Sequence, residues 1–225
     1  MGTTERRERQ RQELRKQILE AARELFATEG YESVTMRRIA EKIEYSPTAI
    51  YFHFKDKEAL IRELCTTDFL ALAFQFQKIA RIADPIDRLR RIGLAYLEFA
   101  LEHPNQYRLM FMTPHPPVEP EEGLLEKGNP EQDAYAFLRA TIENARNARL
   151  FRPEFGDADQ LAQLFWAGMH GVISLHLAKA NDPWVPWKPV QTTSKLLLEG
   201  LVRGFTCKNT RAAPPSAAKR PKAKR

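Results

Sequence analysis

The sequence predicts an all-α protein of about nine helices, arranged as a small N-terminal domain and a larger C-terminal domain. Apolar residues recur at intervals of three and four along most of the chain, as they do on one face of an α-helix. Residues that cap or end helices, such as Thr35, Ser46 and Gly30, stand where this periodicity starts or stops. A chain of 225 residues, 43% of them hydrophobic, is long enough to bury a substantial core.

The net charge of +6 comes from the C-terminal end of the chain. Of the 35 Lys and Arg residues, seven lie in 208–225, which leaves 28 against 29 Asp and Glu residues. Overall basicity is therefore poor support for nucleic-acid binding by the body. We expect residues 208–225 to be a disordered basic tail, which serves either as a non-specific DNA contact or as a solubilising segment.

Signals for a membrane, a metal or an oxidising compartment are lacking in the sequence. Residues 1–12 are charged, and no apolar run reaches the length of a membrane span. Cys65 and Cys207 lie far apart and match no metal or redox spacing. We therefore expect a cytoplasmic protein with reduced thiols, without membrane association, metal or cofactor.

The stretch 34–60 carries the main functional signal. Thr35 suits the N-cap of a helix, because its hydroxyl can accept from a free backbone N–H of the first turn. An apolar face follows it at Met36, Ile39, Ala40 and Ile43. Ser46 and Pro47 then begin a second helix that runs to about Phe52.

This second helix is too short to be stable alone, so it must be held by its neighbours. Ile50 and Phe54 are expected to hold it. The side chains left facing outward are then Thr48, Ala49, Tyr51 and His53. A short helix presented in this way after a turn is typical of a DNA-reading helix-turn-helix.

Residues 39–60 closely resemble the DNA-binding motif of the TetR/AcrR family of bacterial transcriptional regulators. The family closes this motif with S-x-x-x-L/I-Y-x-H/Y-F-x-D/S-K-E/D-x-L, matched here by Ser46, Ile50, Tyr51, His53, Phe54, Asp56, Lys57, Glu58 and Leu60. Glu44 departs from the pattern, because the family usually has Gly in the turn between the helices. A left-handed residue other than Gly costs about 1–2 kcal/mol, so we expect a slightly altered turn.

The resemblance implies which side chains contact DNA: Thr35, Arg37, Arg38, Ser46, Pro47, Thr48, Ala49, Tyr51, His53 and Lys57. Pro47, Thr48 and Ala49 are expected at base edges, with apolar contact to thymine methyl groups, while most of the others match family positions that bind phosphate. Tyr51 and His53 could instead pack between helices.

The expected organisation is a flexible basic arm at 1–12, the helix-turn-helix domain at 13–58, and a regulatory and dimerisation domain at 59–207. The arm contains Arg6, Arg7, Arg9 and Arg11. It is either a frayed extension of the first helix or an arm that reaches phosphates or the minor groove.

Helices of the second domain are predicted at 57–81, 85–102, 107–112, 131–150, 157–179 and 193–206, with a Pro-rich loop at 113–130. The helix at 57–81 must connect the two domains, as a lever or as a rigid strut.

The last two predicted helices are apolar on both faces, so both faces should be buried. Gly168 and Gly171 are poor helix formers, which suggests that another backbone comes close. One chain has too few other helices to cover these faces, and we predict a symmetric interface of two helices from each subunit. Its predicted residues are Leu164, Gly168, Gly171, Val172, Leu175, Leu197, Leu201 and Phe205. Residues 166–178 also resemble a C-terminal regulatory domain found in part of the family.

In the family, the corresponding helical bundle usually encloses a pocket for a small molecule. The residues expected to line such a pocket are Phe69, Phe76, Tyr96, Tyr107, Phe111, Phe137, Trp166 and His170, and they favour a small hydrophobic or aromatic ligand. An aromatic cluster of this kind could equally be core, and a lone histidine on an apolar face is usually structural.

The sequence therefore predicts a ligand-responsive repressor that binds a near-palindromic operator as a homodimer. The alternative is an architectural or partner-recruiting DNA-bound protein on the same fold, without an inducer. An enzyme is not expected, because the chain lacks G-x-S-x-G, a P-loop, a paired-Cys motif and HExxH.

Overall fold

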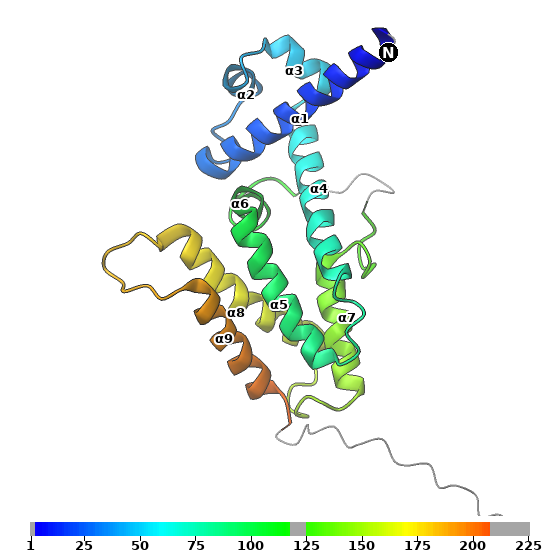
Figure 1. Ribbon diagram of the computed structural model, residues 1–225, viewed down its shortest axis with the longest axis vertical. Coiled ribbons are helices and arrows are strands. Elements are labelled where there is room, and N and C mark those ends of the chain that lie inside the picture. Colours follow the sequence, from blue (N-terminus) through cyan, green and yellow to red (C-terminus); the bar gives the residue numbers. More distant parts are fainter. Residues whose placement is uncertain (1–2, 118–124, 208–225) are drawn as a thin grey trace, which may run out of the picture.

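The computed structural model describes residues 3–117 and 125–207, and these form nine α-helices with one isolated β-bridge (Figure 1). The helices are α1 (Thr3–Glu29), α2 (Met36–Lys42), α3 (Pro47–His53), α4 (Lys57–Gln77), α5 (Pro85–Glu102), α6 (Pro104–Phe111), α7 (Ala134–Asn147), α8 (Ala158–Lys179) and α9 (Val190–Phe205). The all-α prediction is confirmed. The predicted tail at 208–225 and part of the predicted loop, 118–124, lie outside the described residues.

The N-terminal core is built from α1, α2, α3 and the first two turns of α4. Its fully buried members include Ile18, Phe26, Ile39, Ile50 and Leu60. α1 begins at Thr3, so most of the expected arm is a helical extension, exposed from residue 4 to residue 13. The helix ends before Gly30, whose φ of 85° is a conformation that only glycine adopts without strain.

The C-terminal core surrounds α5, which lies between α4 and α7 on one side and α8 and α9 on the other (Figure 1). Each of these helices buries one apolar stripe against α5 or its neighbours. At the far end, the backbone after α7 pairs with the end of α9 through the Phe151–Thr206 bridge. This arrangement leaves one face of α8 and α9 without a neighbouring helix (Figure 1).

Five predicted helix ends are wrong by three or four residues. One of them is the start of α6, which begins at Pro104 and not at 107, because Pro at the first helical position loses no needed donor. α4 ends at Gln77 and not at 81, because Ile79 and Ala80 bond to carbonyls three residues back and the chain tightens into turns. α7 spans Ala134–Asn147 instead of 131–150: the Asp133 carboxylate caps its start, and Arg149 adopts a left-handed φ of 54° after its end. α9 starts at Val190, which is buried, and not at 193.

α6 joins the two cores. Leu109 of this helix is fully buried in the N-terminal core, whereas Tyr107 and Met110 belong to the C-terminal one. Beside Leu109, the buried carboxylate of Asp68 on α4 accepts two hydrogen bonds from Arg23 of α1, at 2.8 and 3.1 Å, and one from Gln106 of α6, at 2.8 Å. An ion pair buried in this way holds its geometry firmly, because separating it would leave an uncompensated charge.

Candidate nucleic-acid interface and internal cavity

The turn between α2 and α3 forms from the predicted capping residues. The Thr35 hydroxyl accepts from the Arg38 N–H at 3.1 Å, and the Ser46 hydroxyl accepts from the Ala49 N–H at 3.3 Å. Between the two helices, Glu44 adopts a φ of 60°. This is a left-handed conformation at the position where the family usually has Gly, so the turn carries the strain of a side chain there.

One side of α3 packs into the N-terminal core, and the opposite side is exposed to solvent. Ile50 and Phe54 are buried, as predicted, and pack into the N-terminal core. Ser46, Pro47 and Thr48 are exposed, and so is Tyr51, at 55%. Ala49 and His53 are half-buried, so they lie at the edges of the exposed face.

Phe52 is an exposed residue of α3 that the sequence reasoning did not select. Its side chain is 72% exposed, and the Arg11 guanidinium of α1 lies 5.5 Å from its ring centroid. The helical period contains the signal, because Phe52 follows Thr48 by four residues and therefore shares its face. Because phenylalanine is apolar, its residue type favours a core position, and Phe52 was therefore not predicted on the exposed face. Arg11 also shows that the exposed extension of α1 runs beside the end of α3.

The predicted phosphate-binding residues have partners within the protein. Arg37 pairs with Glu41 and Arg38 with Glu29, each at 3.0 Å and each on the surface, where such pairs exchange readily with solvent. Lys57 donates to the Tyr31 carbonyl at 2.9 Å, and its ammonium lies 4.1 Å from the Tyr31 ring centroid.

The pKa of His53 is lowered by burial and by the nearby Arg11 and Arg15. The imidazole is therefore mainly neutral at pH 7 in the protein alone, and its N–H can donate a hydrogen bond to a phosphate.

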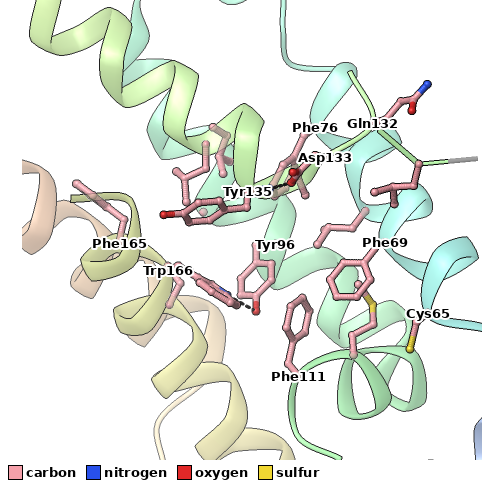
Figure 2. A pocket seen from close by; sticks show the side chains of 18 of the residues that line it. Cys65, Phe69, Phe76, Tyr96, Phe111, Gln132, Asp133, Tyr135, Phe165 and Trp166 are labelled. Atoms are coloured by element: carbon pink, nitrogen blue, oxygen red, sulfur yellow. Dashed lines mark hydrogen bonds between the residues drawn. The ribbon is translucent and has the colours of Figure 1, made fainter. Parts of the chain in front are cut away.

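A cavity of about 480 Å³ lies inside the C-terminal domain, between α4, α5, α6, α7 and α8 (Figure 2). This volume is in the range of pockets that enclose small organic molecules. Of the eight residues expected to line it, five do so: Phe69, Phe76, Tyr96, Phe111 and Trp166. Figure 2 shows these aromatic rings converging from different helices.

The other three expected residues, Tyr107, Phe137 and His170, do not line the cavity. Tyr107 is fully buried and stacks on His170, with ring centroids 5.6 Å apart. Phe137 packs against the far side of Phe76, at 6.0 Å. These residues support the lining without forming it, because helix periodicity alone does not say which buried ring reaches the cavity.

Most of the additional lining residues are apolar: Leu72, Leu89, Ile92, Met110, Leu138, Phe165, Met169 and Leu198. Polar side chains come mainly from α4, the segment after α6 and the segment before α7: Thr66, His115, Lys127, Gln132 and Asp133. Tyr135 and Cys65 also reach the cavity. Burial raises the pKa of the Cys65 thiol to about 12, so this cysteine stays protonated and unreactive at neutral pH.

A polar cluster stands at one wall of this apolar space. The Trp166 indole N–H donates to the Tyr96 hydroxyl oxygen at 3.0 Å. The Nδ1 atom of His170 lies 2.6 Å from the Tyr107 hydroxyl and 3.4 Å from that of Tyr96. Burial lowers the pKa of His170 and raises that of Tyr96 to about 12, so both side chains are neutral at pH 7.

The face of α8 and α9 that faces away from α5 exposes large apolar side chains. Leu175 is 53% exposed and Leu164 is 44% exposed, while Val172, Leu197, Leu201 and Phe205 are half-buried. A Cβ on Gly168 would lie 2.9 Å from the Leu201 side chain of the same chain, whereas a Cβ on Gly171 would point into open space. Within one protomer, the close neighbour expected at Gly168 is thus a side chain and not a backbone.

α8 is also the one helix of the described residues that is long and apolar enough to cross a membrane, and 28% of its apolar window is buried. Among the same residues, no group of three or more His, Cys, Asp or Glu side chains is placed to hold a metal ion.

Two family comparisons cover both domains. The sequence model of bacterial regulatory proteins of the tetR family matches residues 18–64, and that of the tetracyclin repressor-like C-terminal domain matches residues 89–199. The first match contains the α2–α3 motif, and the second contains most of the helices around the cavity.

Individual relatives match over less than half of their length. The chain is 34% identical over 91 residues to the transcriptional regulator UidR of Escherichia coli, a match that covers 40% of this chain and 41% of UidR. It is 38% identical over 96 residues to the transcriptional repressor AcnR of Corynebacterium glutamicum, covering 43% and 45% of the two chains. The match thus spans about two fifths of the length of these relatives.

Solved structures share the complete fold at low identity. The TetR family regulator PfmR of Thermus thermophilus superposes with a TM-score of 0.66 at 22% identity, over 83% of this chain and 97% of PfmR. The fatty acid degradation regulator FadR of Bacillus halodurans gives a TM-score of 0.65 at 14% identity, over 84% and 95%. Together with the two family matches, this shared fold shows that the chain belongs to the TetR family of bacterial transcriptional regulators.

Proposed function

We propose that this chain regulates transcription by binding a near-palindromic operator as a homodimer, and that a small hydrophobic ligand sets its affinity for DNA. The observation that carries the proposal is α3, whose exposed face is displayed on a buried base of Ile50 and Phe54. A seven-residue helix is not stable alone, so core residues must hold α3 in place for this face to be presented.

α3 would enter the major groove with its N-terminal residues leading. Pro47, Thr48 and Ala49 would meet base edges, and we add Phe52, whose exposed ring suits contact with a thymine methyl group. The phosphate contacts would come from Thr35, Arg37, Arg38, Tyr51 and His53, with Ser46 holding the start of α3. Lys57 would contribute one of its two N–H donors that the Tyr31 carbonyl does not occupy.

The exposed apolar face of α8 and α9 supports a homodimer. A two-fold axis along this face would cover Leu164 and Leu175 with the same residues of a second copy and form a four-helix interface. Two copies of α3 could then occupy successive major grooves about 34 Å apart, which is the requirement for reading a palindrome.

The cavity supports regulation by a ligand because α6 touches both the cavity and the DNA-binding core. Met110 and Phe111 line the cavity, while Leu109 and Gln106 contact the N-terminal part. A ligand that favours one position of α6 would shift the equilibrium between two dimer states. AcnR is a repressor by name, which supports repression as the direction of control. A cavity beside this joint has no evident use in an architectural protein without an inducer.

Selection of bound duplexes from a random DNA library, followed by anisotropy titration of the enriched sequence, tests this function. We expect a near-palindrome bound by two copies, and loss of that binding in Thr48→Trp while the dimer persists in sedimentation. Enrichment of no sequence, or equal affinity for all duplexes at moderate salt, would refute the proposal.

A further inference from the structure

We infer that the cavity binds a mostly apolar molecule that carries no negative charge and has one hydrogen-bond-accepting oxygen, and that the Tyr96 hydroxyl donates to that oxygen. This inference rests on the proposed function, which assigns the cavity to a regulatory ligand. It adds the chemistry by which such a ligand would be selected, through a residue that both lines the cavity and belongs to the polar cluster at its wall.

Charge is the first constraint on the ligand. Among the described residues that line the cavity, Lys127 is the one Lys or Arg and Asp133 the one acid. The Asp133 carboxylate caps α7 by accepting from the Tyr135 and Ala136 N–H groups, and it also accepts from the Gly128 N–H. Lys127 is exposed to solvent. An anionic group placed among the aromatic rings would lose its hydration and would share the cavity with the Asp133 carboxylate, which disfavours anions.

His115 does not change this conclusion. Its Nδ1 atom lies 2.8 Å from the Pro116 carbonyl, which can only accept, so Nδ1 carries the proton. The other ring nitrogen lies 3.8 Å from the Cys65 sulfur. Both ring nitrogens of His115 thus have neighbours within the protein.

The hydrogen bonds of the polar cluster identify the spare donor. The Nδ1 atom of His170 lies 2.6 Å from the Tyr107 hydroxyl. As part of this inference we assign the proton of the neutral imidazole to Nε2, so that the one lone pair of Nδ1 accepts from Tyr107. The Tyr96 hydroxyl is 3.4 Å from the same nitrogen, too far to compete. Its oxygen already accepts from Trp166, which polarises the O–H bond and strengthens it as a donor. Within the cluster, the remaining acceptor for the Tyr96 hydroxyl proton is the Tyr107 oxygen. A ligand oxygen in the cavity would give this proton a second possible acceptor.

Three probes of the same shape separate these contributions: 2-acetylnaphthalene, 2-isopropenylnaphthalene and 2-naphthoate. The ketone has an acceptor oxygen, the alkene replaces that oxygen by carbon, and the carboxylate carries a charge. Calorimetric titration of the full chain without DNA measures each dissociation constant. We expect naphthoate to bind at least tenfold more weakly than the ketone. We expect Tyr96→Phe to reduce the preference for the ketone over the alkene by about three- to tenfold.

Tyr135→Phe is the matched control, because Tyr135 also lines the cavity but its hydroxyl already donates to Asp159 at 3.2 Å, outside the polar cluster. It should keep the preference for the ketone. An unchanged preference in Tyr96→Phe, an equal loss in both variants, or equal binding of naphthoate would overturn the inference, and so would failure of all three probes to bind. Operator binding is measured separately, so DNA binding can stand when the ligand chemistry fails. A probe that binds without weakening operator binding would support the site and refute its regulatory role.

Discussion

Single residues in the α2–α3 motif have separable roles, in turn geometry, in anchoring and in recognition. Glu44 belongs to the first group, since it occupies a left-handed conformation with a φ of 60°. Ile50 and Phe54 anchor α3, and Thr48 and Phe52 face outward. Substitutions can therefore change the free energy of unfolding and the affinity for DNA independently.

Glu44→Gly should stabilise the protein. Removing the Cβ relieves about 1–2 kcal/mol of strain in the turn, and the added freedom of glycine in the unfolded chain takes back about 0.4–1 kcal/mol. We expect the free energy of unfolding in urea to rise by about 0.5–1 kcal/mol, the difference between these terms. Glu44→Gln keeps the Cβ and removes the charge, so it should change stability by less than about 0.5 kcal/mol. Equal effects of both variants would assign the gain to charge and not to backbone strain.

Phe52→Ala should weaken operator binding without changing stability. The side chain is 72% exposed, so its loss should alter the free energy of unfolding by less than about 0.5 kcal/mol. Loss of an apolar base contact should raise the dissociation constant for the selected operator by roughly fivefold or more in anisotropy titrations. Phe74 of α4 is also 72% exposed and lies in the other domain, so Phe74→Ala is the matched control and should bind normally. Normal operator binding by Phe52→Ala would remove Phe52 from the interface.

Among the helices, α6 has the most divided role, because its eight residues belong to both cores. Neighbouring residues on a helix point about 100° apart, and this places Leu109 in the N-terminal core and Met110 at the cavity. Gln106, one turn before, reaches the buried Arg23–Asp68 pair. A change in the position of α6 must therefore alter the contacts that α6 makes with α1 and with the Arg23–Asp68 pair.

Leu109→Ala and Met110→Ala should separate these two roles of α6. Truncating the fully buried Leu109 should cost about 2–5 kcal/mol and loosen the DNA-binding core. Amide hydrogen exchange in α1 and α3 should then speed up. Met110→Ala enlarges the cavity instead, so the faster exchange should fall in the helices around it. Identical exchange patterns in the two variants would show that α6 does not divide its contacts between the cores.

At the scale of the whole molecule, one protomer leaves a face of α8 and α9 with exposed apolar side chains. Leu196 of α9 is 71% exposed, and Leu175 of α8 is 53% exposed. The loop between them adds Trp184, which is 90% exposed. Extended apolar surface of this kind marks a contact with another molecule, and we assign it to a second copy of the chain.

Leu175→Arg should give a folded monomer. An exposed leucine contributes little to the stability of the protomer, but across a two-fold interface the substitution brings two unpaired charges into an apolar contact. Sedimentation should show the wild type as a dimer and the variant as a monomer, with operator affinity reduced at least tenfold because one α3 reads half a site. Phe74→Arg, on a surface away from α8 and α9, should remain a dimer. A dimeric Leu175→Arg protein would place the interface elsewhere.

Local features of this fold could be read from the sequence because they depend on neighbours along the chain. Thr35 and Ser46 cap α2 and α3, and Glu44 takes the left-handed turn, as their positions predicted. Capping and helical period act over three or four residues, and a single sequence displays them directly. The predicted ends of α4 and α9 missed by a few residues, because side-chain burial at Ile79 and Val190 competes with those local rules.

The lining of the cavity depended on contacts between distant helices. Tyr96 and Tyr107 are both aromatic and both were expected at the pocket, yet only Tyr96 lines it. Which ring reaches the cavity is set by small shifts and rotations of α5, α6 and α8 against one another, to which helical periodicity is insensitive. The spare hydroxyl of Tyr96 arises in the same way, since it depends on Trp166 and His170 of α8, which lie 70 and 74 residues further along the chain.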